Sequence, residues 1–409
     1  MSDSAPLRAD EVVVGCVTEN NPKYLGQTLR LLQSIRWFGG ELARARVVVG
    51  AVEQIDPRAR RAFEALGAEV RIVPQFDARN PPGNRLQVFE ELYPSAEENF
   101  LVLDCDTIVV RDPLPLLRRD AFQAKVAPLA TVTHDVFERL FAHFGLPLPE
   151  RTYVTAYTGV PTIPYFNSGV CLIPKHLTPQ FVREWRRFNA LLAANQELVA
   201  PCQRHLHQAS LALALAASGI PTATLGAELN FQLNMTQFPT PPEYLEIDPY
   251  IIHYHQLVDD DGMLLPTLFP KSQTRIDAFH DRLRDERSRA IRVHRREPSA
   301  QVSPKQIAVL GMHRSGTSIV ARLLNAMGCY AGESHEMPAG DVFNPTGYWE
   351  HRDVWALDED ILAALDASWL DPARADLSRI GDAARKTFVS RARGVASALD
   401  PHGSWMVKD

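Results

Sequence analysis

Short apolar, β-branched runs alternate with stretches of helical periodicity over residues 11–110. This alternation is typical of successive βαβ units, which build a mostly parallel sheet with helices on its faces. We predict strands over four segments, Glu11–Cys16, Arg46–Val52, Glu69–Val73 and Phe100–Leu103. Helices are predicted after Asn21-Pro22, a cap followed by a first-turn proline, over Glu53–Gly67 and over Gly83–Leu92. The fold class is therefore α/β, with a Rossmann-like, mostly parallel sheet.

The pattern loosens from residue 111 to 165, which is rich in proline apart from one amphipathic stretch, His134–Phe144. We interpret this region as a lid or a substrate-shaping insertion. From Phe166 onward the sequence again shows a regular strand and helix pattern. The later predictions are a strand over Gly169–Ile173, helices over Pro179–Leu198 and His207–Ser218, and a short strand over Tyr250–His255.

An arginine-rich segment over 281–297 then divides the chain. A solvated helix and linker explains it most simply, and an anion- or membrane-binding arm is the alternative. A strand over Gln306–Leu310, a loop over Gly311–Ser315 and a helix over Gly316–Met327 start the α/β pattern again. We therefore predict three regions: a first domain over 8–280, a linker over 281–302 and a second domain over 303–409.

Composition excludes several classes of protein. A chain of 409 residues exceeds what one hydrophobic core normally supports, and a net charge of -6 argues against a general nucleic-acid binder. The sequence shows neither a signal peptide nor an apolar run of the roughly 18 residues that a membrane span needs. The five cysteines form no CxxC pair, which favours free thiols in a reducing compartment. We predict a cytoplasmic protein, with peripheral attachment to the inner membrane as the alternative.

Two aspartates, Asp104 and Asp106, follow the apolar run Phe100–Leu103. They stand at the carboxyl end of a predicted buried strand, which is the edge where α/β sheets bind ligands. Carboxylates at i and i+2 of an extended segment point to the same side and can share one hard divalent cation. Such a cation would bridge the phosphates of a nucleoside diphosphate. The alternative is a pair of turn aspartates without a ligand.

The stretch from Phe100 to Pro113 resembles the metal-binding strand of GT-A glycosyltransferases, in particular the family 8 enzymes. Three further segments match in the right order, and the resemblance covers roughly residues 10 to 260: Val13–Thr18, Asn84-Arg85 and Tyr165–Val170. It implies a GT-A fold, a Mn²⁺ or Mg²⁺ ion, a UDP-sugar-like donor and a hydroxyl acceptor on a glycan, glycolipid or small molecule. By the same resemblance, six residues would bind donor or acceptor: Val17, Thr18, Arg85, Asn167, Ser168 and Gly169.

The family often takes a third metal ligand from a histidine late in the domain. His253 is the favoured match and His255 the alternative, since alternation along a strand lets only one of them face the metal. A further alternative is that both are ordinary half-buried histidines. Gln208 is the candidate catalytic residue, because it falls where the family has a residue facing the sugar, and a polar residue at a helix start is the alternative. His207 precedes it in place of the usual aspartate. This departure leaves the residue that assists transfer, and the stereochemical outcome, open. A zinc site at Cys202, His205 and His207 is disfavoured for want of a fourth ligand.

A glycine-rich loop, GMHRSGTS from Gly311 to Ser318, follows the predicted strand of the second domain. It has the Walker A spacing except that Thr317 stands in place of the lysine, which argues against a kinase or ATPase. An amide-lined turn before a helix still binds a phosphate. A nucleotide-kinase fragment is the alternative reading of this domain.

The loop resembles the 5′-phosphosulfate loop of sulfotransferases that use the sulfate donor PAPS, and the segment Phe343–Arg352 resembles bacterial sulfotransferases. The resemblance implies a PAPS-phosphate site whose members are Arg314, Ser315, Gly316, Thr317 and Ser318. Arg314 would stabilise the departing phosphate, and Glu350 or His351 would either deprotonate an acceptor hydroxyl or serve a structural role. The family's 3′-phosphate site normally lies beyond the final segment, so we expect an incomplete sulfotransferase domain. The first domain is expected to be a glycosyltransferase, and a non-catalytic sugar-nucleotide scaffold is the alternative.

Overall fold

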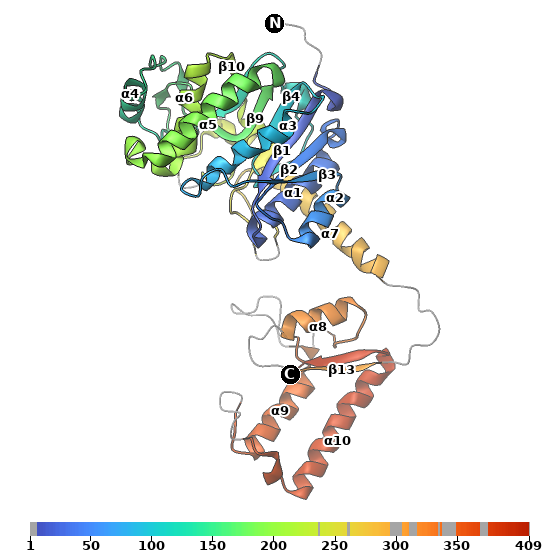
Figure 1. Ribbon diagram of the computed structural model, residues 1–409. Coiled ribbons are helices and arrows are strands. Elements are labelled where there is room, and N and C mark those ends of the chain that lie inside the picture. Colours follow the sequence, from blue (N-terminus) through green and yellow to red (C-terminus); the bar gives the residue numbers. More distant parts are fainter. Residues whose placement is uncertain are drawn as a thin grey trace. The chain divides into compact units, whose positions relative to one another are not determined.

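The computed structural model describes residues 6–235, 238–259, 262–294, 305–310, 317–333, 336–337, 349–368 and 375–408. The chain divides into two compact units, Met1–Leu283 and Arg284–Asp409. The division falls within one helix, α7 (Pro270–His294). Figure 1 shows both units coloured along the sequence, with labels on many of their helices and strands.

A mixed sheet organises the first unit. In spatial order its strands, as far as the structure describes the chain, are β10 (Thr222–Thr224), β6 (Phe122–Val126), β9 (Phe166–Pro174), β4 (Asn99–Leu103), β1 (Val12–Thr18), β2 (Arg46–Val52) and β3 (Ala68–Val73). The neighbours β4, β1, β2 and β3 run parallel, as do β10 and β6. Only β9 among them runs antiparallel to both of its neighbours. The predicted α/β class with a mostly parallel sheet is confirmed.

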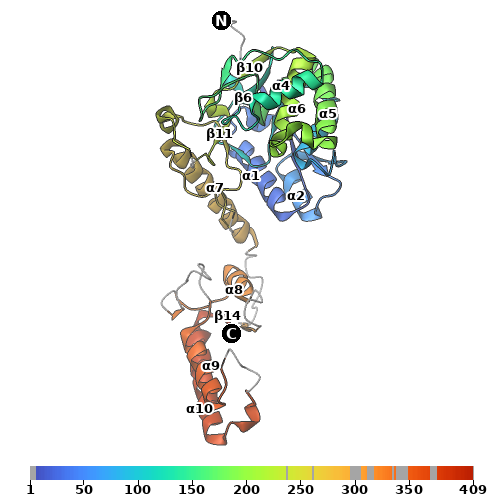
Figure 2. The ribbon, with the colours of Figure 1, turned by 90° about the vertical axis from the view of Figure 1, so that its left-hand side faces the viewer.

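The helices of this unit lie on both faces of the sheet. Those on the two faces are α1 (Pro22–Phe38), α2 (Pro57–Ala65), α3 (Val88–Leu92), α4 (His134–His143), α5 (Thr178–Ala194) and α6 (Leu206–Ser218), and the unit also holds the first part of α7. Val13 of β1 packs in the core beneath α3, α5 and α6, whereas Val12 and Val14 pack in the core beneath α1 and α2. Figure 2 shows α4, α5 and α6 gathered together beside the sheet. Burial on both faces explains the continuous apolar runs of the parallel strands.

Local capping sets the helix boundaries. Asn21 accepts a hydrogen bond from the Tyr24 amide at 3.1 Å, so α1 begins at the predicted proline. The second helix is shorter than predicted, because the Asp56 side chain caps it and α2 begins only at the residue that follows. The segment predicted as the third helix begins instead as a 3-10 turn, Pro81–Gln87, ahead of α3.

The region between 111 and 165 was expected to be an insertion, but it contributes β6 to the central sheet and α4 to the core beside it. The unit also holds a short sheet of β11 (Phe231–Gln232), β12 (Ile251–His253) and β5 (Thr107–Val109), and a hairpin of β7 (Tyr153–Val154) and β8 (Pro161–Thr162). In the short sheet His253 pairs with Thr107. This pairing brings a late segment beside the aspartates.

The second unit contains β13 (Gln306–Val309) paired in parallel with β14 (Trp405–Lys408). Its helices in the described ranges are α8 (Thr317–Ala326), α9 (Arg352–Ala364) and α10 (Asp382–Leu399). Its core centres on Val309, Ala321, Ala331 and Met406. Throughout the part of the chain that the structure describes, none of the helices is both apolar enough and long enough to cross a membrane.

Candidate metal and donor site

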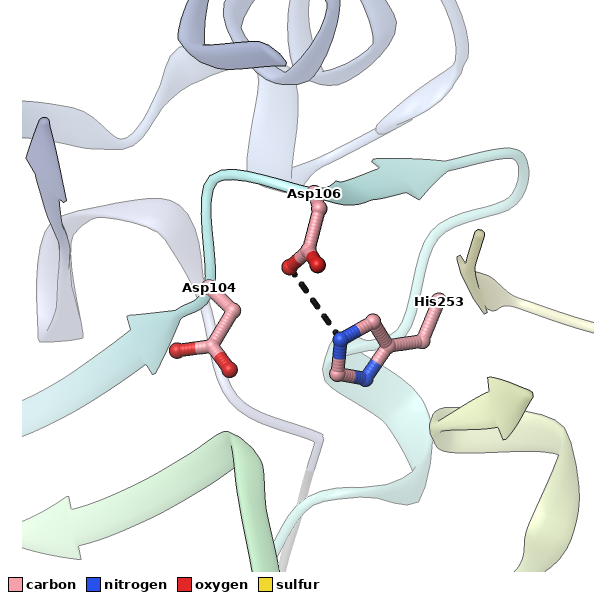
Figure 3. A group of neighbouring side chains, drawn as sticks. All are labelled: Asp104, Asp106 and His253. Atoms are coloured by element: carbon pink, nitrogen blue, oxygen red, sulfur yellow. Dashed lines mark ion pairs between the residues drawn. The ribbon is translucent and has the colours of Figure 1, made fainter. Parts of the chain in front are cut away.

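The two aspartates sit on a closed turn at the carboxyl end of β4. The Asp104 amide donates to the carbonyl of Gly169 at 2.8 Å, and the Asp104 carbonyl accepts from the Thr107 amide at 3.1 Å and its hydroxyl at 2.8 Å. The Asp106 carbonyl accepts from the Tyr254 amide at 3.1 Å. The main chain is therefore fixed on both sides of the pair, and the carboxylates face the same space (Figure 3).

His253, the last residue of β12, completes this cluster. Its Nε2 lies 3.1 Å from Oδ1 of Asp106 (Figure 3). One ligand atom from each of Asp104, Asp106 and His253 lies within 4.8 Å of the others. His255 lies outside the cluster, because β12 has ended, its φ is 56°, and its ring stacks on that of His253 at 4.0 Å.

The charges in the cluster are strongly coupled. Burial acts to raise the pKa of Asp106, but the neighbouring His253 outweighs it and lowers that pKa to about 2. Burial and the Asp106 charge raise the pKa of Asp104, although Arg85 opposes them. Burial acts to lower the pKa of His253, yet Asp106 raises it above its ordinary value. Two carboxylates and one imidazole form a donor set that suits Mn²⁺ or Mg²⁺, and a cation there would relieve the repulsion between the acids.

Arg85, from the turn before α3, joins the aspartates to β9. Its Nη2 lies 3.0 and 3.1 Å from the two carboxylate oxygens of Asp104. Its Nη1 donates to the carbonyl of Ser168 at 2.9 Å and also to the hydroxyl of that residue. A guanidinium held this way provides positive charge beside the carboxylates, where a diphosphate would need it.

The segment Asn167-Ser168-Gly169 lies at the start of β9, and all three residues are buried. A Cβ on Gly169 would lie 2.4 Å from Cε1 and 2.6 Å from Nδ1 of His253. Contacts this short are sterically forbidden, so glycine is required for the imidazole to pack over β9. This close approach holds the His253 ring toward the aspartates.

Gln208 is buried near the start of α6. Its Oε1 accepts from the Tyr165 hydroxyl at 2.6 Å, and that hydroxyl also pairs with Thr131 at 2.6 Å. The preceding His207 has a buried Nδ1 without a partner in the part that the structure describes. Burial and then Arg85 lower the pKa of His207 well below its ordinary value, so this ring is neutral near pH 7.

The remaining donor residues expected from the sequence lie at the end of β1. Thr18 is 1% exposed, and within the described residues its hydroxyl finds no hydrogen-bond partner. Val17 is half-buried and packs against the core beneath α3, α5 and α6. The structure thus places both at the carboxyl edge of the sheet that also carries Asp104.

A family model described as the Rhodobacterales glycosyltransferase domain matches residues 15–219. This match spans half of the chain. The chain belongs to this family. The matched range of the glycosyltransferase domain contains the aspartate pair, Arg85, the Asn167 segment and Gln208, and it ends before β11 and β12.

Several solved structures resemble the Rhodobacterales glycosyltransferase. The galactosyltransferase LgtC, solved with donor and acceptor sugar analogs, is 16% identical, with a TM-score of 0.42 over 64% of this chain and 94% of LgtC. Mouse xyloside xylosyltransferase 1 is 13% identical, with a TM-score of 0.38 over 60% of this chain and 98% of its own. GlyE of Streptococcus pneumoniae TIGR4 is 16% identical, with a TM-score of 0.39 over 78% of this chain and 74% of its own. No curated protein matches the chain.

Two buried residues beside the site of this glycosyltransferase were missed by sequence reasoning, Lys125 and Asn230. Lys125 on β6 is 3% exposed, and its Nζ donates to the carbonyl of Asn230 at 3.1 Å. Burial lowers the pKa of Lys125 to about 7, although Glu228 opposes this shift. The sequence offered one signal for Lys125, a lysine within the largely apolar segment Ala121–Ala127. Polar residues at alternate positions of a strand, here Gln123 and Lys125, normally indicate a solvent-exposed face, so the lysine was not expected to be buried.

Lys125→Met is expected to change how stability depends on pH. Between about pH 7 and the ordinary lysine pKa of 10.5, Lys125 is neutral when folded and charged when unfolded. The unfolded state then binds more protons, so wild-type stability should rise with pH relative to the variant, by up to about 1.4 kcal/mol per pH unit. Urea unfolding at a series of pH values measures this difference. A constant difference across the window would contradict the neutral buried lysine.

The residues expected to bind PAPS are only partly described. Arg314, Ser315 and Gly316 lie outside the described residues, while Thr317 and Ser318 are the first residues of α8. In the segment resembling bacterial sulfotransferases, Glu350 and His351 both have partners within the protein. Glu350 pairs with Lys408, and the His351 ring caps α9 by accepting from the Asp353 amide at 3.3 Å.

The free cysteines fit the expectation of unpaired thiols. Cys16, Cys171 and Cys202 are buried, and Cys105 and Cys329 are half-buried. Among the residues that the structure describes, the cluster of Asp104, Asp106 and His253 is the one group of potential metal ligands close enough to share an ion. Cys202, His205 and His207 form no such group.

Proposed function

We propose that this Rhodobacterales glycosyltransferase is a metal-dependent GT-A enzyme that moves a sugar from a UDP-sugar-like donor to a hydroxyl on a glycan, lipid or small molecule. The observation that carries the proposal is the convergence of Asp104, Asp106 and His253 at the carboxyl edge of the sheet, with Arg85 beside them. In a glycosyltransferase, a divalent cation held by two carboxylates and an imidazole suits the diphosphate of the nucleotide-sugar donor.

Asp104, Asp106 and His253 would hold a Mn²⁺ or Mg²⁺ ion, which supplies positive charge to the diphosphate when bound. In the transfer, the bond between the anomeric carbon and the β-phosphate oxygen breaks, and its electron pair leaves on the phosphate. The acceptor oxygen forms the new bond to the anomeric carbon, and its proton passes to the leaving diphosphate or to water. Arg85 supplies a fixed cation near the leaving group.

The other site residues have binding roles in this proposal. Asn167, Ser168 and Gly169 form a buried wall beside the aspartates, and Val17 and Thr18 lie along the same edge where the base would bind. Gln208 faces the sugar with its amide fixed by Tyr165, because the Tyr165 hydroxyl donates to Oε1 and leaves the Nε2 hydrogens for a sugar oxygen.

A thermal-shift screen of nucleotide sugars with and without Mn²⁺ tests the proposal. One donor is expected to raise the melting temperature only when the metal is present, because ligand at about a hundred times its Kd adds about 2.7 kcal/mol of stability. The stabilising compound also identifies the base and the sugar. Equal stabilisation without metal contradicts metal dependence, and metal-dependent binding without turnover of any acceptor series favours the scaffold alternative.

We also propose that residues 303–409 belong to a PAPS-type sulfotransferase domain, after a first domain over 8–280 and a linker over 281–302. The support is the GMHRSGTS sequence together with β13 before it and α8 after it. The same screen extends to this proposal, with stabilisation by adenosine 3′,5′-bisphosphate as the expected result. Preferential stabilisation by ATP favours the kinase alternative instead.

A further inference from the structure

A line of buried hydrogen bonds runs from the main chain of β9 to the imidazole of His253. The Gly169 amide donates to Oδ1 of Asn167 at 2.9 Å, and Nδ2 of Asn230 donates to the same oxygen at 2.9 Å. Oδ1 of Asn230 then lies 3.1 Å from Nδ1 of His253. The side chains belong to residues that are between 0% and 8% exposed, so water does not compete for these bonds.

The direction of every bond in this line follows from its first member. A main-chain N–H can only donate, so Asn167 must present its oxygen to Gly169. Asn230 shares that oxygen and must therefore present its NH₂ group to Asn167. The remaining Asn230 atom is its oxygen, which faces His253 and can only accept. The Nδ1 atom of His253 consequently carries a hydrogen.

We propose that Asn230 is a positioning residue that fixes the Nδ1–H tautomer of His253 and so directs the lone pair of Nε2 toward the two aspartates. The inference rests on the proposed metal-dependent function. A neutral histidine binds a metal through its unprotonated nitrogen, and a hydrogen bond on the other nitrogen decides which one that is. Nε2 is the nitrogen that lies 3.1 Å from Asp106 in the cluster.

The position of Asn230 is itself fixed by its main chain. Its amide donates to the carbonyl of Ala227 at 3.3 Å, and its carbonyl accepts from Lys125 at 3.1 Å. The residue is 0% exposed. With both main-chain groups and both side-chain atoms engaged, Asn230 cannot turn its amide without breaking bonds in a buried site, where each unpaired group costs about 1–3 kcal/mol.

The first test needs no substitution. Nitrogen NMR of ¹⁵N-histidine-labelled full-length protein saturated with diamagnetic Mg²⁺, which takes the place of a hydrogen between Nε2 and Asp106, reports which ring nitrogen carries the hydrogen. The His253 signal is the one that disappears in His253→Asn. A protonated Nδ1 with no hydrogen on Nε2 is expected in the wild type. The opposite tautomer in the wild type would overturn the inference.

Substitutions supply the second test, with Mn²⁺ affinity measured by calorimetry. Asn230→Ala should release the tautomer and weaken Mn²⁺ binding about 10- to 100-fold, the usual effect of losing such a partner. Asn230→Asp should recover part of this affinity, because a carboxylate still accepts from Nδ1–H although it can no longer donate to Oδ1 of Asn167. Asn189→Ala is the matched control: Asn189 is 1% exposed in a similar amide network with Asn80 and Ser210, and its loss should leave tautomer and affinity unchanged.

The outcomes separate the inference from the function on which it rests. If the wild-type protein binds no Mn²⁺ or Mg²⁺, the metal-dependent function fails and the inference fails with it, whereas metal binding with a bare Nδ1 refutes the role of Asn230 alone. If Asn230→Ala keeps both the wild-type tautomer and the wild-type affinity, the role of Asn230 is refuted. If Asn230→Ala does not fold, the wild-type tautomer and the Asn230→Asp affinity still decide.

Discussion

Asp106→Asn is expected to reduce kcat/KM for sugar transfer by at least about 1000-fold, because a metal ion supplies several kcal/mol of charge stabilisation and each tenfold corresponds to about 1.4 kcal/mol. The asparagine keeps the shape of the side chain but removes the charge. It also removes the carboxylate that lies 3.1 Å from Nε2 of His253. Release of nucleoside diphosphate from the donor identified in the screen, followed with and without Mn²⁺, measures the effect.

Asp112→Asn provides a control from the same segment. The Asp112 carboxylate accepts from the amides of Glu41 and Leu114 and belongs to a turn rather than to the ligand cluster. This variant should retain metal-dependent activity within a few fold of the wild type, although it loses some stability. Comparable activity in the Asp106 and Asp112 variants would refute the metal role of Asp106.

Gly169→Ala is expected to displace His253 and weaken Mn²⁺ binding by more than tenfold while the unit still folds. The added Cβ would overlap Cε1 and Nδ1 of the imidazole and would also press on Oδ1 of Asn167 at 3.0 Å. The ring cannot move aside freely, since His253 is 3% exposed. Overpacking of this kind costs about 1–3 kcal/mol. Calorimetric titration with Mn²⁺ and a melting curve together measure binding and stability.

Gly50→Ala separates crowding at the site from the general cost of a methyl group in this sheet. Gly50 lies within β2, and a Cβ there would meet Val73 at 3.4 Å and Val17 at 3.5 Å, which are ordinary contacts. We expect this variant to bind Mn²⁺ as the wild type does. If Gly169→Ala bound Mn²⁺ equally well, the close approach of His253 to β9 would have no part in the site.

Much of the sheet follows from sequence pattern because its central strands are buried on both faces. The runs that became β1, β2 and β4 are apolar, whereas Glu69 and Arg71 interrupt the run that became β3. All four are flanked by turn signals and were found within a residue or two. β6 was missed because Gln123 and Lys125 interrupt its apolar pattern. Both are buried in the folded chain, where Gln123 bonds the main chain of Arg118 and Lys125 bonds that of Asn230. A strand whose polar residues find their partners only after folding has no local signature.

The residues of the candidate site also fall into two groups, those that the sequence pattern indicates and those that it does not. The spacing of Asp104 and Asp106 after an apolar run indicates a ligand site. His253, which comes much later in the sequence, lies beside them because β12 pairs with β5. Asn230 carries no comparable pattern. Its importance arises from contacts with Asn167 and His253, which are far from it in the sequence. Long-range pairings of this kind are set by the fold and leave no mark in the local sequence.

Because β9 runs antiparallel to β4, its first residues lie beside the metal cluster and its last residue lies at the opposite edge of the sheet. Substitutions near the end of β9 are therefore expected to affect the site less than substitutions near its start. Val170 pairs with Leu103 beside the aspartates, whereas Pro174 pairs with Asn99 at the opposite edge of the sheet. A strand running the other way would have carried Asn167 and Gly169 away from the site. Residues after Pro174, in the turn Lys175–Leu177, therefore lie at the edge remote from the metal cluster. A fluorophore or affinity handle attached at His176 should report on the enzyme without disturbing donor binding.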